Sequence, residues 1–319
     1  MSAFGTLFLD RDAVAANLDP AKLLDVLADG FKAITLRDGV IAPDRGELVV
    51  GDSGRLLTMQ AYAPGLPIGT KLVSNFPGNH QAGLPSHLAL IVLIDADTGA
   101  ALAVMDGTHI TAMRTAGAAL LAAKLLARPD ARVMTILGAG VQGQAHLALM
   151  GQHFDLETIH IGSRNRASAE RLAASDPRAV VTDDDEAAVR RSDIVCLCSD
   201  SAQALILDAW VQPGQHISSV GYAPPGGELD PAIAARHRLF VEAKIALSAP
   251  PAGCAELAGL DPARATEIGE LLLGQKPGRE THEEVTVYKA MGHAMEDLVV
   301  ADMVYRNALE RGAGRQVSL

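Results

Sequence analysis

Three glycines, Gly138, Gly140 and Gly143, follow the apolar segment 133–137 with the spacing GxGxxG, and a helical pattern begins directly after them. In a dinucleotide-binding turn the first glycine permits a tight bend, the second admits the pyrophosphate, and the third lets helix and strand pack closely. The N-terminus of the helix then faces the anion. The sequence therefore predicts a dinucleotide site made by Gly138, Gly140, Val141, Gln142 and Gly143. The alternative is a tight turn that binds nothing, but a second strand at 159–161 follows where a βαβ unit requires one.

The residues after this second strand bear on which dinucleotide binds. An NAD site usually has Asp or Glu here, which binds the ribose 2′-hydroxyl. This chain has Ser163, Arg164 and Asn165 instead. A carboxylate would repel a 2′-phosphate, whereas Arg beside a hydroxyl and an amide would hold one through charge-assisted hydrogen bonds. We therefore predict that these three residues bind NADP(H). If Arg164 is only a solvated residue at a helix start, use of NAD(H) stays open.

Three isolated cations in the N-terminal part could bind an anionic substrate. Arg45 follows Ala-Pro-Asp, Lys71 opens an apolar strand after Gly-Thr, and Arg114 lies within a long Ala- and Leu-rich helix at 110–126. Together they would suit a carboxylate, which Arg binds with two parallel hydrogen bonds. Spacing alone does not show that they converge, and each one by itself is better explained by a surface charge or a structural ion pair.

The elements that must position these residues change in character near residue 125. Before it, a helix that opens at Asp19-Pro20 precedes several short strands, including two apolar runs at 88–94 and 101–105. After it, strands and helices alternate, which predicts right-handed crossovers and a doubly wound parallel sheet. We expect an α/β protein with a Rossmann-type dinucleotide-binding domain at 125–285. Residues 1–124 and 286–319, whose last helix is expected at 291–309, would form a split α+β domain.

Composition excludes several other classes of protein. The 319 residues include 27 Lys and Arg against 38 Asp and Glu, a net charge of −11, which disfavours general nucleic-acid binding. Three cysteines without zinc spacing fit a reducing compartment rather than a disulfide framework. The longest apolar run, 88–94, is far shorter than the ~20 residues that span a bilayer. No signal peptide is expected, so the prediction is a cytoplasmic protein without a membrane partner. The acidic run 183–186 is interpreted as helix capping rather than a metal site.

Several stretches together resemble the ornithine cyclodeaminase/mu-crystallin family. They are Gly-Leu-Pro-Ser-His at 83–87, Ala-Val-Met-Asp-Gly at 103–107, Ile-Thr-Ala-Met-Arg-Thr-Ala at 110–116, the glycine turn at 138–143, Glu-Leu-Asp at 228–230 and Thr-Val-Tyr-Lys-Ala-Met-Gly at 286–292. The resemblance implies a homodimer, with the split domain forming the substrate site and the dimer interface. It also implies that Arg45, Lys71 and Arg114 converge on a substrate carboxylate beside the nicotinamide. Ser-Arg-Asn at 163–165 is similar to the sequence of the NADPH-using mu-crystallins.

One departure from the family pattern bears on the reaction. Cyclodeaminases and related alanine dehydrogenases carry a catalytic Asp in a Gly-x-Asp-x-Pro-Gly loop, where this chain has Ala223. Loss of a general base costs roughly 10²–10⁴-fold in rate, but reduction of a preformed imine needs no attacking water. We therefore predict NAD(P)H-dependent reduction of a small, cyclic α-imino acid, such as pyrroline-2-carboxylate or piperideine-2-carboxylate, to an L-amino acid. The alternatives are an NAD-dependent cyclodeaminase of ornithine or lysine, an amino acid dehydrogenase resembling alanine dehydrogenase, and a non-enzymatic binding protein resembling mu-crystallin.

The remaining candidate residues lie near expected strand ends. Ser199 follows a strand at the edge where open sheets bind ligands, so we expect it to contact the cofactor. The resemblance places Met291 and His293 near the nicotinamide, and His293, Tyr222 or Lys71 would supply the proton. Glu228 and Asp230 are interpreted as caps of the next helix, since Asp230-Pro231 is a helix-start signal.

Overall fold

The computed structural model describes residues 5–318 and divides into two compact units. The first comprises Met1–Arg114 and His293–Leu319, and the second comprises Thr115–Gly292. Both boundaries differ from those expected above. The first boundary lies inside the helix α3 (Gly107–Leu126). Residues 286–292 belong to the second unit, because the strand β14 (Thr286–Lys289) pairs on both sides with strands of its parallel sheet.

The first unit contains a mixed seven-stranded sheet. Its strands are β1 (Gly5–Leu9), β2 (Gly46–Val50), β3 (Gly54–Ala61), β4 (Ile68–Asn75), β5 (His87–Ile94), β6 (Ala101–Asp106) and β15 (Arg315–Ser318). Their spatial order is β15-β1-β6-β5-β4-β3-β2. Strands β1 and β6 are parallel, and the other neighbours are antiparallel. Because β2 to β6 follow one another as an antiparallel meander, successive strands lie beside each other with short connections.

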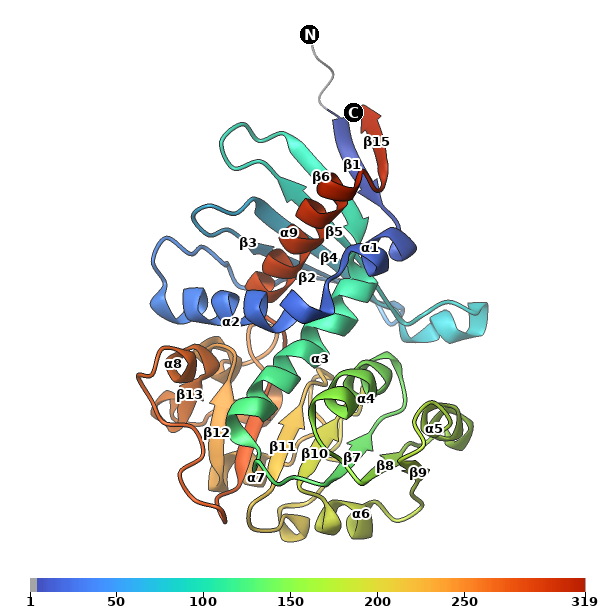
Figure 1. The fold of residues 1–319 in the computed structure, drawn as a ribbon, viewed down its shortest axis with the longest axis vertical. Coiled ribbons are helices and arrows are strands. Elements are labelled where there is room, and N and C mark those ends of the chain that lie inside the picture. The colour runs from blue at the N-terminus through green and yellow to red at the C-terminus, as the bar shows by residue number, and fades with distance from the viewer. Residues whose placement is uncertain (1–4, 319) are drawn as a thin grey trace. The chain divides into compact units, whose positions relative to one another are not determined.

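Helices cover one face of this sheet. They are α1 (Arg11–Asn17), α2 (Pro20–Leu36) and α9 (Ala294–Arg311), with a short 3₁₀ helix η1 (Pro77–Ala82) between β4 and β5. Helix α9 packs on β3, β4, β5 and α2, and Figure 1 shows it lying across the strands. A Cβ atom at Gly69 of β4 would lie 3.0 Å from the Leu298 side chain, so glycine there allows α9 to lie close to the sheet. Asp19 caps α2, and Pro20 occupies its first turn, as the sequence predicts.

The second unit is built on an eight-stranded parallel sheet. Besides β14, its strands are β7 (Val133–Leu137), β8 (Thr158–Gly162), β9 (Ala179–Val181), β10 (Ile194–Leu197), β11 (His216–Ser219), β12 (Arg238–Val241) and β13 (Ala265–Glu267). Their order is β13-β12-β14-β11-β10-β7-β8-β9. The run from β9 to β14 is the doubly wound order of dinucleotide-binding domains, with the reversal between β7 and β10. The predicted Rossmann-type sheet and the additional α+β part are confirmed.

The connections between these parallel strands are mostly helical. They are α4 (Val141–His153), α5 (Arg166–Ala173), α6 (Asp185–Arg191), α7 (Pro231–Arg236), α8 (Ile268–Leu272) and the 3₁₀ turns η2 (Asp208–Trp210), η3 (Lys244–Leu247), η4 (Ala255–Leu257) and η5 (Pro262–Arg264). Asp184 caps α6, so the predicted capping role of the acidic run is confirmed. Within residues 5–318, no helix is long and apolar enough to cross a membrane.

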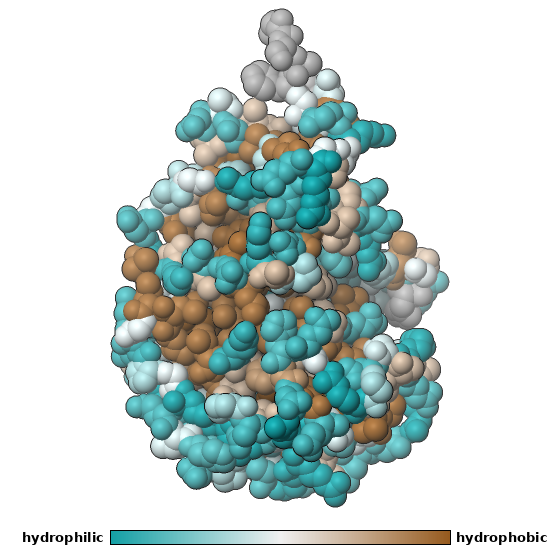
Figure 2. Space-filling model, in the orientation of Figure 1, coloured by the Kyte–Doolittle hydropathy of each residue, from teal (hydrophilic) through white to brown (hydrophobic). Residues whose placement is uncertain are grey.

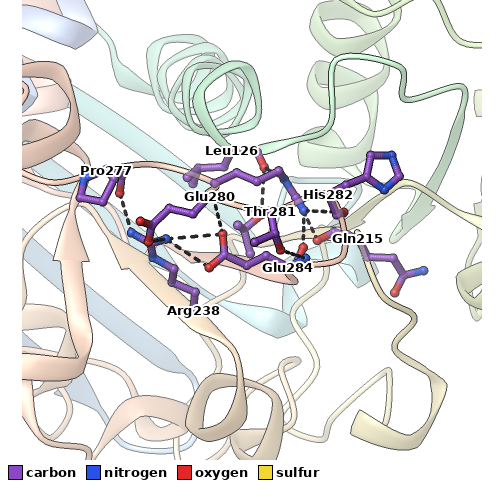
Figure 3. A network of polar contacts seen from close by, with 10 residues as sticks. Leu126, Gln215, Arg238, Pro277, Glu280, Thr281, His282 and Glu284 are labelled. Carbon is purple, nitrogen blue, oxygen red and sulfur yellow. Dashed lines mark hydrogen bonds and ion pairs between the residues drawn. The ribbon is translucent and has the colours of Figure 1, made fainter.

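A polar network closes the amino edge of this sheet, and Figure 3 shows it from close by. Its hub is Arg279. Its guanidinium donates to the carbonyl oxygens of Leu126 at the end of α3 (2.7 Å), Gln215 before β11 (3.0 Å), His282 (3.3 Å) and Glu284, and to the hydroxyl of Thr286 in β14 (3.1 Å). Arg238, the first residue of β12, is bound by Glu280, Glu284 and the carbonyl oxygen of Pro277. The opposite, carboxyl edge of the strands is left for the loops that follow β7, β8, β10 and β11.

Candidate active site

Two of the three predicted cations lie together inside the first unit. Lys71 is on β4 directly opposite Met59 of β3 and Ile91 of β5, so its side chain points to the face that α9 covers. Its ammonium forms an ion pair with Asp297 in the first turn of α9, with 2.6 Å between Nζ and Oδ2. Arg114, which comes from α3, donates from Nε to the other oxygen of Asp297 (2.9 Å). One carboxylate thus holds both cations.

Glu296 adds a second carboxylate to this group. Its Oε2 atom accepts a hydrogen bond from Nη1 of Arg114 at 3.1 Å. Its Oε1 atom accepts from the backbone N–H of His293 at 2.8 Å, as part of the capping box that begins α9. All four charged side chains of Lys71, Arg114, Glu296 and Asp297 are at least 94% removed from solvent. We call these four residues the charged quartet.

Burial and the neighbouring charges set the protonation of the quartet. Burial lowers the pKa of Lys71 from 10.5 to about 8, although Asp297 opposes this shift. Burial raises the pKa of Asp297, but the charges of Arg114 and Lys71 outweigh it and hold that pKa below its usual value. For Glu296, burial dominates and the pKa is raised. Arg45 contributes repulsion to Lys71, so the third predicted cation lies within electrostatic range of the quartet.

His293 has a structural partner of its own. It is the N-cap of α9, and its Nδ1 atom accepts a hydrogen bond from the backbone N–H of Met295 at 3.2 Å. Burial lowers its pKa to about 4. The ring is therefore neutral near pH 7, with its proton on Nε2. A neutral imidazole is a poor acid, so this ring does not suit the proton-donor role considered for it.

The glycine turn of the second unit has the shape that a pyrophosphate needs. Gly138 has a φ of 118°, and a Cβ atom there would lie 2.4 Å from the carbonyl oxygen of Cys198. A Cβ atom at Gly143 would lie 2.0 Å from the carbonyl oxygen of Gly138. Gly140 differs, because no atom beyond its immediate chain neighbours lies within 4 Å of its Cβ position. It is also the N-cap of α4 and offers no side-chain cap, so the first N–H groups of the helix stay available to an anion. Val141 and Gln142 open that helix, and the turn as a whole fits a dinucleotide.

The residues expected at the adenosine ribose are placed at the end of β8. Arg164 is 86% exposed, and its guanidinium lies 3.4 Å from the carboxylate of Asp200, in the loop after β10. The side chain of Asn165 caps α5 by accepting from the N–H of Ser168, and the hydroxyl of Ser163 accepts from the N–H of Asn165. Arg164 and Asn165 are both exposed, but the side chain of Asn165 is engaged in capping α5.

Ser199 and the loop after β11 are joined by a buried carboxylate. Glu228 accepts five hydrogen bonds, from the N–H (2.7 Å) and hydroxyl (2.8 Å) of Ser199, the hydroxyl of Ser219 (3.0 Å), and the N–H groups of Val220 (3.1 Å) and Gly221 (2.6 Å). The expectation that Glu228 caps the next helix is wrong. Asp230 alone has that role, accepting from the N–H of Ala232 at 2.9 Å.

Met291 follows β14 at the same carboxyl edge. Its N–H donates to Oε1 of Glu242 at 2.9 Å, and its side chain is buried in the apolar core of the second unit. Sequence reasoning gave no role to Glu242, Glu296, Asp297 or Lys289. The sequence signal for Glu296 and Asp297 was their position in the first turn of a predicted helix. Acidic residues are common at such positions simply because they stabilise the helix dipole.

Comparison with known proteins agrees with this geometry. The model of the ornithine cyclodeaminase/mu-crystallin family matches residues 6–312. The ketimine reductase mu-crystallin of Rattus norvegicus is 36% identical over 305 residues, which cover 93% of this chain and 96% of that protein. The structure of Thermococcus litoralis Delta(1)-pyrroline-2-carboxylate reductase in complex with NADH and L-proline is 30% identical, with a TM-score of 0.91, and the match covers 98% of this chain and 100% of that one. An archaeal alanine dehydrogenase dimer with bound NAD is also 30% identical, with a TM-score of 0.88 and coverage of 98% and 99%. The chain therefore belongs to the ornithine cyclodeaminase/mu-crystallin family.

Proposed function

We propose that this protein reduces a small, cyclic α-imino acid, such as pyrroline-2-carboxylate or piperideine-2-carboxylate, to the L-amino acid, with NADPH as the preferred reductant. The observation that carries the proposal is the charge of the group around Lys71. Arg45, Lys71 and Arg114 supply three formal positive charges, and Glu296 and Asp297 supply two negative ones, so the sum is 3 − 2 = +1. A single excess positive charge in a buried setting suits a substrate with one carboxylate.

The class of enzyme follows from the family. The chain is an NAD(P)-dependent oxidoreductase that acts on carbon–nitrogen bonds, and its relatives include a ketimine reductase and a pyrroline-2-carboxylate reductase. Imine reduction is the general reaction. The ring size of the substrate and the choice between NADPH and NADH are the finer parts of our proposal.

Each residue of the site would have a distinct role in the reaction. The bound dinucleotide supplies the hydride that is added to the imine carbon. Arg45 and Arg114 bind the substrate carboxylate and orient the imine, and such positioning accounts for much of an enzyme's acceleration. Lys71, whose pKa is lowered to about 8, carries a proton at neutral pH and gives it to the imine nitrogen, so that C=N becomes CH–NH. Asp297 holds the ammonium of Lys71 in place through its 2.6 Å contact.

The loop after β11 argues against a cyclodeaminase. Ala223 stands where cyclodeaminases carry their catalytic Asp. Glu228 is the one acidic residue between 220 and 229, and its two oxygens already accept five hydrogen bonds. Both oxygens of this carboxylate are therefore already engaged by protein donors. The loop therefore offers no base to activate a water molecule, and imine reduction needs none.

Arg164 supports the preference for NADPH. Its exposed guanidinium lies at the end of β8, where a 2′-phosphate on the adenosine ribose would be bound. Asp200 competes for the same guanidinium, but an exposed ion pair contributes only about 0–1 kcal/mol. A phosphate that carries nearly two negative charges would displace it readily.

We also propose a homodimer formed through the first unit. Strand β2 is an edge strand whose five residues are all exposed, including Leu48, Val49 and Val50. Figure 2 shows that apolar side chains interrupt the polar covering on the face drawn. An edge strand with exposed apolar side chains is typical of a surface that another chain covers. The related alanine dehydrogenase is a dimer.

The test is a direct assay of reduction. Purified protein is mixed with NADPH or NADH and with each cyclic imine, and loss of cofactor absorbance and the chirality of the product are followed. We expect rapid oxidation, faster with NADPH, and an L-amino acid product. If neither imine is reduced, the proposed substrate class is wrong; NADPH binding without any turnover would instead favour a binding protein. Conversion of ornithine with NAD⁺ would favour a cyclodeaminase.

A further inference from the structure

The carboxyl edge of the parallel sheet contains a second buried charged group that the reaction above does not use. Lys289, the last residue of β14, is fully buried, and its ammonium lies 2.8 Å from Oε1 of Glu256 in η4. The same ammonium donates to the hydroxyl of Ser219 (3.1 Å) and to the carbonyl oxygen of Gly221 (2.7 Å). Ser219 in turn donates to Glu228. Glu228, Ser219, Lys289 and Glu256 therefore form one continuous chain, which we call the edge chain.

The edge chain fastens the loop 221–227 at both of its ends. At the start, Glu228 binds the N–H of Gly221 and Lys289 binds its carbonyl oxygen. At the end, the carboxylate of Glu256 fills the space beside Gly227, where a Cβ atom would lie 1.8 Å from Oε1. The N–H and the carbonyl oxygen of Gly221 are thus bound by charged side chains, and the carboxylate of Glu256 packs directly against Gly227. Hydrogen bonds to ionised groups are about twice as strong as those between neutral groups.

The edge chain also holds this loop against the neighbouring one. A Cβ atom at Gly221 would lie 2.3 Å from the carbonyl oxygen of Ser199, and one at Gly226 would lie 2.1 Å from that of Ala202. The two loops therefore touch backbone to backbone. Glu228 binds the N–H of Ser199 on one loop and that of Gly221 on the other. This one carboxylate therefore links the loop after β10 to the loop after β11.

These loops belong to the second mononucleotide-binding half of the sheet. The glycine turn and Arg164 follow β7 and β8 in the first half, so the adenosine side of a dinucleotide belongs there. The strands β10, β11 and β14 form the other half, whose carboxyl edge receives the other nucleotide. A shift of either loop would therefore change the surface offered to the reacting end of the cofactor. The adenosine side meets the loop after β10 through the exposed ion pair of Arg164 and Asp200, which contributes only about 0–1 kcal/mol, so adenosine binding should change little.

We propose that Glu228, together with the Lys289–Glu256 ion pair, is a positioning device for the reacting half of the cofactor. It acts through the backbone of residues 199–202 and 221–227, and none of the three side chains contacts the reacting atoms. The inference rests on the use of a nicotinamide dinucleotide. It predicts that a change in the edge chain weakens cofactor binding and turnover far more than its effect on stability explains.

The test uses Glu228→Gln in the full chain, with Arg279→Lys as a matched control. Both side chains make five hydrogen bonds in the same unit, but Arg279 is only partly buried and belongs to the network at the amino edge. In E228Q one carboxylate oxygen becomes an amide nitrogen, which cannot accept from the N–H groups that face it. We measure the melting temperature, the dissociation constants of NADPH and of adenosine 2′,5′-bisphosphate by titration, and kcat for the imine.

We expect both variants to lower the melting temperature. In E228Q the dissociation constant of NADPH rises about tenfold or more and kcat falls about tenfold or more, while the adenosine fragment binds within about twofold of wild type. In R279K all three values stay within about twofold of wild type. Equal effects of the two variants, or an equal loss of the adenosine fragment and of NADPH in E228Q, would overturn the proposal.

A milder variant keeps the proposal testable if E228Q does not fold. Ser219→Ala removes the hydroxyl that joins Glu228 to Lys289 and changes little volume. We expect a smaller loss of NADPH affinity, about threefold to tenfold, again without loss of the adenosine fragment. Unchanged NADPH binding in S219A would refute the role of the edge chain. Wild-type protein that binds no dinucleotide at all would instead refute the proposed function, so the two failures are distinguishable.

Discussion

Replacement of Asp297 by Asn removes the negative charge that lies between Lys71 and Arg114 while keeping the shape of the side chain. In the wild type, burial lowers the pKa of Lys71 to about 8, and Asp297 prevents it from falling further. A hydrogen bond between charged groups contributes about 1.5–3 kcal/mol. Since one pKa unit corresponds to about 1.4 kcal/mol, loss of this contact should lower the pKa of Lys71 by a further one to two units.

The sign of the expected effect follows from the role given to Lys71. The protonated ammonium is the active form, so activity is present below its pKa and is lost as the pH rises through it. The alkaline limb of kcat/KM should therefore lie near pH 8 in the wild type and about one to two units lower in D297N. The assay is NADPH oxidation with one cyclic imine over a range of pH, and the same imine is used throughout so that its own titration cancels.

Asp302→Asn provides the matched control. Asp302 is on the same helix, α9, and pairs with the partly exposed Arg306 at 2.7 Å, away from Lys71 and Arg114. We expect its pH profile to coincide with that of the wild type. An alkaline limb in D297N that does not move, with kcat/KM reduced equally at every pH, would refute the reasoning. Asp297 would then act only by holding the geometry of the cations, and Lys71 would not be the group that titrates.

Three further predictions follow from the second unit. Arg164→Ala should raise the dissociation constant of NADPH about fivefold to tenfold and leave that of NADH unchanged, as measured by fluorescence titration; equal losses for both cofactors would contradict a contact with the 2′-phosphate. Gly140→Ala should keep the wild-type melting temperature, because no atom lies within 4 Å of the added methyl group, but should abolish measurable dinucleotide binding. His146 is fully buried with a pKa lowered from 6.5 to about 4, so the folded state resists its protonation, and stability present above pH 6.5 is lost as the pH falls toward 4. The free energy of unfolding, measured by denaturant titration, should fall by about 3 kcal/mol over this range, and His146→Gln should reduce this fall. If the free energy of unfolding depends on pH equally in the variant and the wild type, this ring does not contribute.

Local signals predicted the dinucleotide half of the molecule well. The strand 133–137 and the start of the following helix agree with the structure residue for residue. In that region the strand, the glycines and the helix lie next to each other in the sequence, so a short window contains the whole motif. Strands β1 and β15 were not predicted, because each is short and gains its place only by pairing with a distant segment.

The quartet and the edge chain could not be predicted in the same way. Lys71 and Asp297 are separated by most of the chain, and Asp297 in isolation is an ordinary acidic residue near a helix start. Glu228 was interpreted as a cap because it precedes a helix, but its five donors come from the ends of two strands. A charged side chain reveals its partners only when the fold brings separate segments together, and neither spacing nor periodicity contains that information.

The first unit consists of two stretches at opposite ends of the chain, and this affects the order in which the protein folds during synthesis. Strands β1 to β6 of its sheet are translated before residue 114, yet β15 and the helix that covers the sheet, α9, emerge only after all of residues 115–292. Domains generally fold as units during synthesis, with N-terminal ones first. Here the second unit is complete on the ribosome while the first still exposes the sheet face around Leu57, Met59 and Ala61. Because Glu296 and Asp297 arrive with α9, the nascent chain acquires its dinucleotide fold before the carboxylates that pair with Lys71 and Arg114, and no intermediate of translation holds a finished site.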